Sequence, residues 1–233
     1  MSGAPEEHRT SAPPPVLVIF DCDGVLVDSE PISNAVLAEM LAEQGWTLTV
    51  SESRARFQGM LLPDIGVAVE RELGRPLPRG WLDEYVARRA AVFDAELEPV
   101  AGAAALLERV AGAGLPVCIA SQGSLAKIAR SLALTGLERW FPPHARFSAY
   151  EVPRGKPYPD LFLHAAASLG ADPARCAVIE DTPSGVAAAR AAGMTVYGLT
   201  ADSDERALRE AGALTAATLQ EVGDLLLTRA FDN

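Results

Sequence analysis

Four short runs of apolar residues, rich in β-branched side chains, stand out along the chain. They span residues 16–20, 116–120, 176–179 and 195–199. Apolar side chains fill successive positions in these runs, so both faces of each strand are expected to be buried. Segments with helical spacing, such as SLAKIARSLALTG and PSGVAAARAAG, lie between the last three runs. Strands that alternate with helices predict an α/β fold with a doubly wound parallel sheet. Weaker strand patterns occur at residues 145–152 and around Leu214, where an edge strand is expected.

A long stretch with helix signals and no convincing strand separates the first apolar run from the second. Its first segment, PISNAVLAEMLAEQG, carries an apolar stripe at helical spacing, formed by Ile32, Val36, Leu37, Met40 and Leu41. Ser51 or Ser53 could cap the next helix. We predict a helical cap domain at residues 30–99, inserted into a core made of residues 16–29 and 100–233. Because ligands of open α/β sheets bind beyond the carboxyl ends of the strands, this insert would overhang the binding crevice.

The remaining features of the chain favour a cytoplasmic protein. Residues 1–15, MSGAPEEHRTSAPPP, carry prolines and acidic residues where a signal peptide would have a basic start and an apolar stretch, and we expect a disordered leader. No apolar run has the length needed to cross a bilayer, so no membrane partner is expected. The three cysteines, Cys22, Cys118 and Cys176, have no metal-ligand spacing and are expected to be free, buried thiols.

The charge of the chain argues against one class of partner. Twenty Lys and Arg residues against thirty-one Asp and Glu residues give a net charge of −11, and the isoelectric point is about 4.8. A field of this sign repels polyanions, and no basic stripe compensates it, so no nucleic acid is expected to bind. A small anionic substrate remains possible where a few cations or a metal ion overcome the background charge.

Candidate chemical residues stand at the carboxyl ends of the predicted strands or in the loops beside them. Asp21 and Asp23 follow the first strand, Ser121 follows the second, and Glu180 and Asp181 follow the third; Lys156 lies in a loop before a helix. Each also has an ordinary structural reading, as a turn residue, a helix cap or a solvated charge. Together they are expected to converge on one crevice.

Four carboxylates in one pocket predict a bound metal ion. They repel one another unless a divalent cation neutralises them, and ligands that are all oxygen suit a hard ion, namely Mg²⁺. Ser121 and Lys156 would then offer a hydroxyl donor and a positive charge to a phosphoryl group.

These residues lie in a set of motifs that resembles a known family. DCDGVLVDSE, IASQGS, RGKPYPD and VIEDTPSGVAAARAAGM, in this order, are similar to the motifs of the haloacid dehalogenase-like superfamily. The resemblance is to its helical-cap branch, which includes phosphoglycolate phosphatases, sugar phosphatases and β-phosphoglucomutase-like enzymes. It implies a Rossmann-like core beneath a mobile helical cap.

The resemblance also implies roles for single residues. Asp21 would be the nucleophile that forms an aspartyl-phosphate, and Asp23 the general acid and base. The phosphoryl group would be oriented by Ser121, Gln122 and Lys156. The Mg²⁺ ligands would be the Asp21 side chain, the Asp23 backbone carbonyl, Asp181 and, directly or through water, Glu180.

Several alternative activities are separated by particular residues. Dehalogenases of the superfamily lack the second acid, so the presence of Asp23 makes dehalogenation improbable. Mutase relatives carry a cap histidine and a cap arginine, and the corresponding places fall near Ser33 and Leu62, which cannot do that work. Hydrolysis is therefore favoured over mutase activity. A non-enzymatic phospho-acceptor module is the remaining alternative, and the helical insert and Asp23 argue against it.

The expected activity is a Mg²⁺-dependent hydrolysis of a small phosphorylated metabolite, such as a sugar phosphate or a phosphoglycolate-like compound. The cap segment around Gln58, Gly59 and Met60 resembles the specificity loop of the family, although an ordinary connection between helices would look the same. The sequence leaves open the physiological substrate and whether the protein is a monomer or a dimer.

Overall fold

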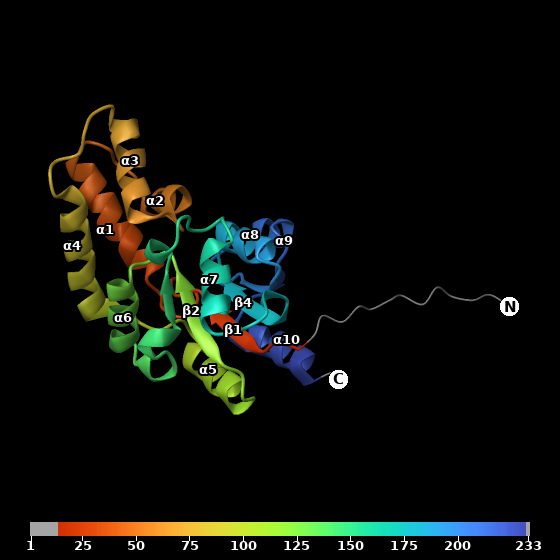
Figure 1. The fold of residues 1–233 in the computed structure, drawn as a ribbon. Helices are drawn as coiled ribbons and strands as arrows, with labels where there is room; N and C mark the ends of the chain where they lie inside the picture. Colours follow the sequence, from red (N-terminus) through yellow and green to blue (C-terminus); the bar gives the residue numbers. More distant parts are fainter. Residues whose placement is uncertain (1–13, 232–233) are drawn as a thin grey trace.

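The computed structural model describes residues 14–231, without the side chains of 229–231, and its centre is a sheet of six strands. The strand order is β3-β2-β1-β4-β5-β6, and all neighbours are parallel. The bounds are β1 Leu17–Phe20, β2 Val117–Ser121, β3 Arg146–Ser148, β4 Cys176–Glu180, β5 Thr195–Leu199 and β6 Leu214–Ala216. The doubly wound α/β fold is therefore confirmed (Figure 1).

The register places β1 in the middle of the sheet. Val18 is paired with Val117 of β2 on one side and with Ala177 of β4 on the other. All four residues of β1 are buried, as its unbroken apolar run predicted. The strand expected at 145–152 is shorter than predicted, because Ser148 and Glu151 form a reciprocal capping box that starts a 3₁₀ helix at Ala149.

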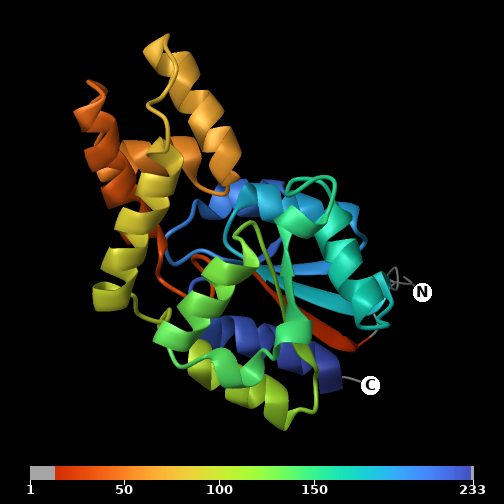
Figure 2. The same ribbon diagram turned by 60° about the vertical axis from the view of Figure 1, so that its left-hand side comes forward.

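Helices cover both faces of the sheet (Figure 2). Val18 and Phe20 pack with residues of α5 (Ala103–Gly112), α6 (Leu125–Leu134) and α10 (Leu219–Phe231). Leu17 and Ile19 point the other way, toward α7 (Asp160–Ser168), α8 (Pro183–Ala191) and α9 (Glu205–Glu210). This alternation follows from the two-residue period of a strand, and it makes two apolar layers around one sheet.

Four helices between β1 and α5 form a separate layer with its own apolar cluster. Their bounds are α1 Glu30–Glu43, α2 Val50–Phe57, α3 Leu62–Leu73 and α4 Trp81–Glu96. Leu37 and Met40 of the predicted stripe are buried in this cluster together with Trp81 and Tyr85. These helices occupy the residues assigned to the insert, and the division into core and cap domains stays a prediction; most of the expected leader lies outside the described residues.

The first turn of α2 corrects one expectation. Neither Ser51 nor Ser53 caps this helix: the N-cap is Thr49, whose hydroxyl accepts the backbone N–H of Glu52. The Glu52 carboxylate in turn accepts the backbone N–H of Thr49 at 2.8 Å. This reciprocal pair satisfies the backbone N–H groups of Thr49 and Glu52, which a cap at Ser51 or Ser53 would leave without these partners. Ser53 is instead buried and donates to Asn34 at 3.0 Å.

Two adjacent chain segments connect the helical layer to the sheet. The backbone N–H of Asp28 donates to Glu98, and that of Val100 donates to Leu26, each at 3.0 Å. The start and the end of the helical insert therefore lie side by side, at the carboxyl end of β1 (Figures 1 and 2).

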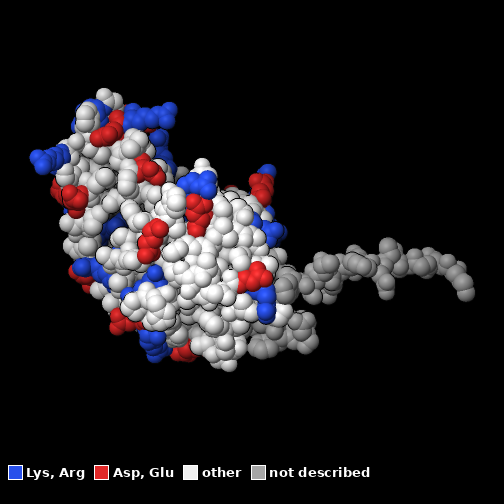
Figure 3. Space-filling model, in the orientation of Figure 1, with Lys and Arg blue, Asp and Glu red and all other residues white. Residues whose placement is uncertain are grey.

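On the face drawn in Figure 3, acidic and basic side chains are interspersed over cap and core, without a continuous basic stripe among the described residues. Within 14–231, none of the helices combines the length and the apolar character that crossing a bilayer requires.

Candidate active site

The predicted site residues meet where β1, β2 and β4 end. Asp21 follows β1, and its backbone N–H continues the ladder by donating to Ile179 of β4 at 2.9 Å. Ser121 is the last residue of β2 and Glu180 the last of β4, and Asp181 follows directly. All four side chains are buried. Parallel strands bring their carboxyl ends to one edge, so this convergence follows from the topology.

Lys156 holds two of the carboxylates together. Its Nζ lies 2.6 Å from Asp21 Oδ1 and 2.5 Å from Glu180 Oε1, and the side chain is only 2% exposed. Burial alone would lower the pKa of this ammonium, but the two carboxylates outweigh burial and raise it. For Asp21, burial and the neighbouring charge of Glu180 outweigh Lys156 and raise the pKa to about 7. One ammonium therefore does not fully compensate the acids around it.

Glu180 also holds the segment that begins the following helix. Its Oε2 accepts the backbone N–H groups of Asp181 and Thr182 at 3.0 and 2.9 Å, and the Thr182 hydroxyl at 2.9 Å. Thr182 is the N-cap of α8, and its hydroxyl accepts the backbone N–H of Gly185 at 3.1 Å. A buried carboxylate at a helix N-terminus is favoured by the helix dipole. This network fixes Glu180 and leaves little freedom for its side chain.

Replacing Gly185 with alanine is expected to destabilise the protein and reduce its activity. A Cβ atom at this position would lie 1.9 Å from Glu180 Oε1, so the carboxylate would have to leave its hydrogen bonds. We expect a loss of about 2 kcal/mol in the free energy of unfolding, measured by urea denaturation. Gly112→Ala, in a helix where an added Cβ meets nothing within 4 Å, is the control. Equal behaviour of the two variants would contradict the tight packing around Glu180.

The acids at the end of β1 and β4 form a group with the geometry of a metal site. One carboxylate oxygen each from Asp21, Glu180 and Asp181 lie within 4.8 Å of one another. Asp181 Oδ1 is buried and has no hydrogen-bond partner among the described residues. Burial and the charges of Glu180 and Asp21 raise the pKa of Asp181 well above its usual value. A buried acceptor without a donor, beside two further carboxylates, fits a hard divalent cation such as Mg²⁺.

Asp23 has a different environment from the other acids, and its side chain is not part of this group. Its Oδ1 accepts a hydrogen bond from the Ser29 hydroxyl and lies 2.6 Å from Lys127 Nζ. Burial by itself would raise the pKa of Asp23, but Lys127 and Ser29 outweigh it, and the pKa is lowered. Sequence reasoning missed both partners, because a serine and a lysine near the start of a helix carry no local signal of a distant partner.

The cap loop between α2 and α3 lies directly on the site. Gln58 donates through Nε2 to Asp181 Oδ2 at 3.1 Å. Gln122 donates to the carbonyl oxygen of Gly59 at 3.1 Å, while its Oε1 accepts the backbone N–H of Lys156 at the same distance. The side chain of Gln122 therefore ties the cap loop to the lysine loop. Gly59 has a φ of +75°, a conformation that favours glycine.

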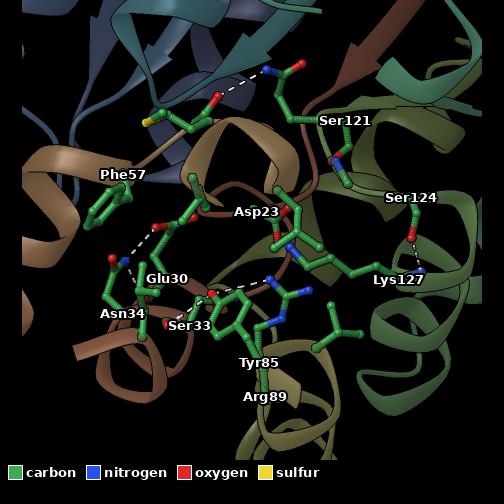
Figure 4. A pocket seen from close by; sticks show the side chains of 18 of the residues that line it. Asp23, Glu30, Ser33, Asn34, Phe57, Tyr85, Arg89, Ser121, Ser124 and Lys127 are labelled. Carbon is green, nitrogen blue, oxygen red and sulfur yellow. Dashed lines mark hydrogen bonds and ion pairs between the residues drawn. The ribbon is translucent and has the colours of Figure 1, made fainter. Parts of the chain in front are cut away.

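A pocket of about 530 Å³ opens between the cap helices and the core. Asp21, Ser121 and Lys156 line it from the core, and Met60 lines it from the cap. The cap also contributes Ser33 and Leu62, near which the sequence analysis expects the histidine and arginine places of mutase relatives. Two residues that the sequence analysis did not single out, Tyr85 and Arg89 of α4, line the pocket as well (Figure 4). Pockets of this size hold small metabolites.

Comparison with known proteins gives the family. The model of the haloacid dehalogenase-like hydrolases matches residues 16–193. The chain is 34% identical to 6-phosphogluconate phosphatase of Escherichia coli (strain K12) over 92% of this chain and 96% of the relative. It is 29% identical to Hexitol phosphatase A of the same organism, over 90% of this chain and 97% of the relative.

A solved structure supports the same assignment. A conserved haloacid dehalogenase-like protein of unknown function from Agrobacterium tumefaciens str. C58 has a TM-score of 0.79 and 36% sequence identity. The match covers 93% of this chain and 99% of that protein. With this family match and these phosphatase relatives, the chain belongs to the haloacid dehalogenase-like hydrolases and is a phosphoric monoester hydrolase.

Proposed function

We propose that this protein is a Mg²⁺-dependent phosphatase that hydrolyses a small phosphorylated metabolite through an aspartyl-phosphate. The observation that carries the proposal is the position of Asp21. Its carboxylate faces the pocket, bound to Lys156 and grouped with Glu180 and Asp181. Two relatives are named as phosphatases of 6-phosphogluconate and of hexitols, so a sugar phosphate is the favoured substrate class, with phosphoglycolate-like compounds next.

In the first step, an Asp21 carboxylate oxygen forms a bond to phosphorus and the bond between phosphorus and the leaving oxygen breaks. Asp23 donates a proton to that oxygen, which leaves as an alcohol. Lys156 and the Ser121 hydroxyl stabilise negative charge on the phosphoryl oxygens. Gln122, the residue after Ser121, is proposed to help orient the same phosphoryl group. Bound Mg²⁺, held by Asp21, Asp181, the Asp23 carbonyl and Glu180 directly or through water, would neutralise carboxylates and phosphoryl oxygens.

In the second step, water attacks the phosphorus of the aspartyl-phosphate and Asp23 accepts its proton. The acyl phosphate bond breaks, phosphate leaves and the Asp21 carboxylate is restored. Lys127 and Ser29 favour the ionised form of Asp23, which is the form that this step needs. For the first step, Asp23 has to carry a proton and therefore to loosen its contact with Lys127.

Hydrolysis is favoured over mutase activity by the residues that line the cap side of the pocket. Ser33 and Leu62 supply no imidazole or guanidinium group, and none of the described residues that line the pocket is a histidine, although Arg89 supplies a guanidinium from α4. Gln58, Gly59 and Met60 are proposed to contact the leaving group, and Gly59 and Met60 do line the pocket.

The test of the proposed function is phosphate release from a panel of phosphomonoesters. The panel contains 6-phosphogluconate, glucitol 6-phosphate, phosphoglycolate and p-nitrophenyl phosphate, each with Mg²⁺ and with EDTA. We expect release that requires Mg²⁺, and no conversion of β-glucose 1-phosphate to glucose 6-phosphate. Release at an equal rate in EDTA, or no release from any compound with Mg²⁺, would refute the proposal.

The thermal stability of the protein is expected to depend on pH and Mg²⁺ together. The pKa of Asp21 is raised from 3.8 to about 7, so between these values the folded state holds a proton that the unfolded chain releases. Without metal, stability should therefore fall as the pH rises through this window. Mg²⁺ replaces the proton, and at about 100 times its dissociation constant it would add about 2.7 kcal/mol. The gain in Tm, measured by calorimetry, should be larger at about pH 8 than at about pH 5. A gain independent of pH would contradict binding at these carboxylates.

A further inference from the structure

Two cations on one wall of the pocket are not among the residues proposed to bind the phosphoryl group. Lys127 comes from α6 of the core and Arg89 from α4 of the cap, and both line the pocket. Figure 4 shows both side chains reaching from separate helices toward the region of Asp23. Asp23 is the residue proposed to protonate the leaving oxygen, so this wall faces the leaving group of the substrate.

Arg89 has no ion-pair partner within 4.0 Å among the described residues, although its charge acts on Asp23 at longer range and helps to lower the pKa of that carboxyl. The Arg89 guanidinium lies over the ring of Tyr85, 4.9 Å from the ring centroid, and 5.7 Å from the ring centroid of Phe93. Its Nη1 is 3.5 Å from the hydroxyl oxygen of Tyr85, which donates its own hydrogen to the Ser33 carbonyl at 3.2 Å. Among the side chains that the structure describes, no carboxylate lies within 4.0 Å of Arg89.

The neighbouring arginine of α4, unlike Arg89, has carboxylate partners. Arg88 is bound to Glu43 and Glu84, each at 2.5 Å, and it does not line the pocket. Arg130 of α6, which also lines the pocket, is likewise paired with Asp94. Arg89 differs from both in being a half-buried arginine that faces the pocket without such a partner among the described residues, in a chain with a net charge of −11. A half-buried cation gains most from an anion that enters the pocket.

The acidic groups in the pocket do not replace that anion. Asp23 is occupied by Lys127 and Ser29. Glu30 lines the pocket and accepts a hydrogen bond from Asn34 Nδ2 at 3.0 Å, on the same helix. Asp21 is bound to Lys156. Arg89 therefore remains available to a ligand, and Lys127, although paired with Asp23 at 2.6 Å, adds a second positive charge to the same wall of the pocket.

We propose that the substrate carries a second anionic group on its leaving-group part, a carboxylate or a second phosphate, and that Arg89 binds this group with support from Lys127. This inference rests on the proposed phosphatase function and defines its substrate class. Arg89 would then determine specificity from the cap, since a planar guanidinium matches the two oxygens of a carboxylate or phosphate.

The test compares compounds that differ only at the far end of the molecule. Inhibition constants against p-nitrophenyl phosphate hydrolysis are measured for 6-phosphogluconate, glucitol 6-phosphate and glucitol 1,6-bisphosphate, which end in a carboxylate, a neutral hydroxymethyl group and a second phosphate. In the natural protein, at least one anionic compound is expected to bind about tenfold or more tightly than the neutral one. The ranking of the two anionic compounds then tells whether a carboxylate or a phosphate is preferred.

Variants connect this preference to Arg89. Arg89→Gln should weaken the preferred anionic compound by about 10- to 100-fold and the neutral compound by less than about threefold. Arg89→Lys should retain part of the preference, and Arg88→Gln, which removes the same charge from the same helix outside the pocket, should retain all of it.

The possible failures are distinguishable. If none of the phosphomonoesters of the panel is hydrolysed, the proposed function fails and this inference with it. If phosphate is released but the neutral compound binds as well as both anionic ones, the phosphatase stands and the anionic substrate class is wrong. Equal weakening of all three compounds by Arg89→Gln would also overturn the inference, because the residue would then only shape the pocket.

Discussion

Replacing Asp21 by asparagine is expected to abolish phosphate release while the fold is kept. Asparagine has nearly the same size as aspartate but cannot form the acyl phosphate, so activity should fall by about 10⁴-fold or more. Without metal at about pH 8, the variant should be at least as stable as the natural protein. It removes one of three crowded carboxylates, and the pKa of about 7 for Asp21 shows that burial and its neighbours disfavour the charge of this group. Phosphate release and thermal unfolding measure the two effects.

The matched control for this variant is Asp28→Asn. Asp28 lies in the same loop but its side chain is exposed and does not line the pocket, so activity should be unchanged. Acid quenching of the natural protein with ³²P-labelled substrate should trap label on the protein, and Asp21→Asn should trap none. Label that persists in the variant, or turnover close to that of the natural protein, would assign the nucleophile to another residue.

Replacing Lys156 by methionine is expected to cause the largest loss of stability among single substitutions at the site. Methionine keeps most of the side-chain volume but leaves Asp21 and Glu180 buried without their ammonium. Removing one partner of a buried ion pair costs about 3–5 kcal/mol in the free energy of unfolding. Activity should be lost too, because the charge on the phosphoryl oxygens loses its protein cation. Urea denaturation in EDTA at about pH 8 measures the stability.

The pH dependence separates this electrostatic cause from a simple packing defect. Without Lys156, which lowers the pKa of Asp21, Asp21 keeps its proton more strongly in the folded state, so the loss of stability should be smaller at about pH 5 than at about pH 8. Mg²⁺ should restore part of the stability at the higher pH. Arg154→Gln, which removes an exposed cation from the same loop, should change stability little. A loss for Lys156→Met that is equal at both pH values would contradict the electrostatic explanation.

Much of the site could be predicted, because its residues directly follow strands that the apolar runs of the sequence predict. The apolar run of β1 stops at Asp21, and that of β4 stops at Glu180 and Asp181. Parallel strands then bring these positions to one edge without any further information. Lys156 was predicted from its motif, and the two ion pairs of 2.6 and 2.5 Å are the contacts that make it central.

The contacts that the sequence did not predict join residues from different layers of the fold. Lys127 meets Asp23 across 104 positions of the chain, and Gln58 meets Asp181 across 123. Neither pair has a local signal, because its distance depends on how a helix or a cap loop is packed against the sheet. Arg89 belongs to the same class: its pattern in α4 is that of any arginine on an exposed helix face.

By itself, the sequence determined the sheet, the helical insert and the acids at the strand ends, since a strand buried on both faces needs an unbroken apolar run and its end is marked by the first charged residue. Only the tertiary structure decided which cation meets which acid, that the cap loop touches Asp181, and that Arg89 faces the pocket without a carboxylate partner among the described residues. The reason is that charge pairing acts over a few ångströms between side chains, and this distance is set by the packing of whole elements and not by their own residue patterns.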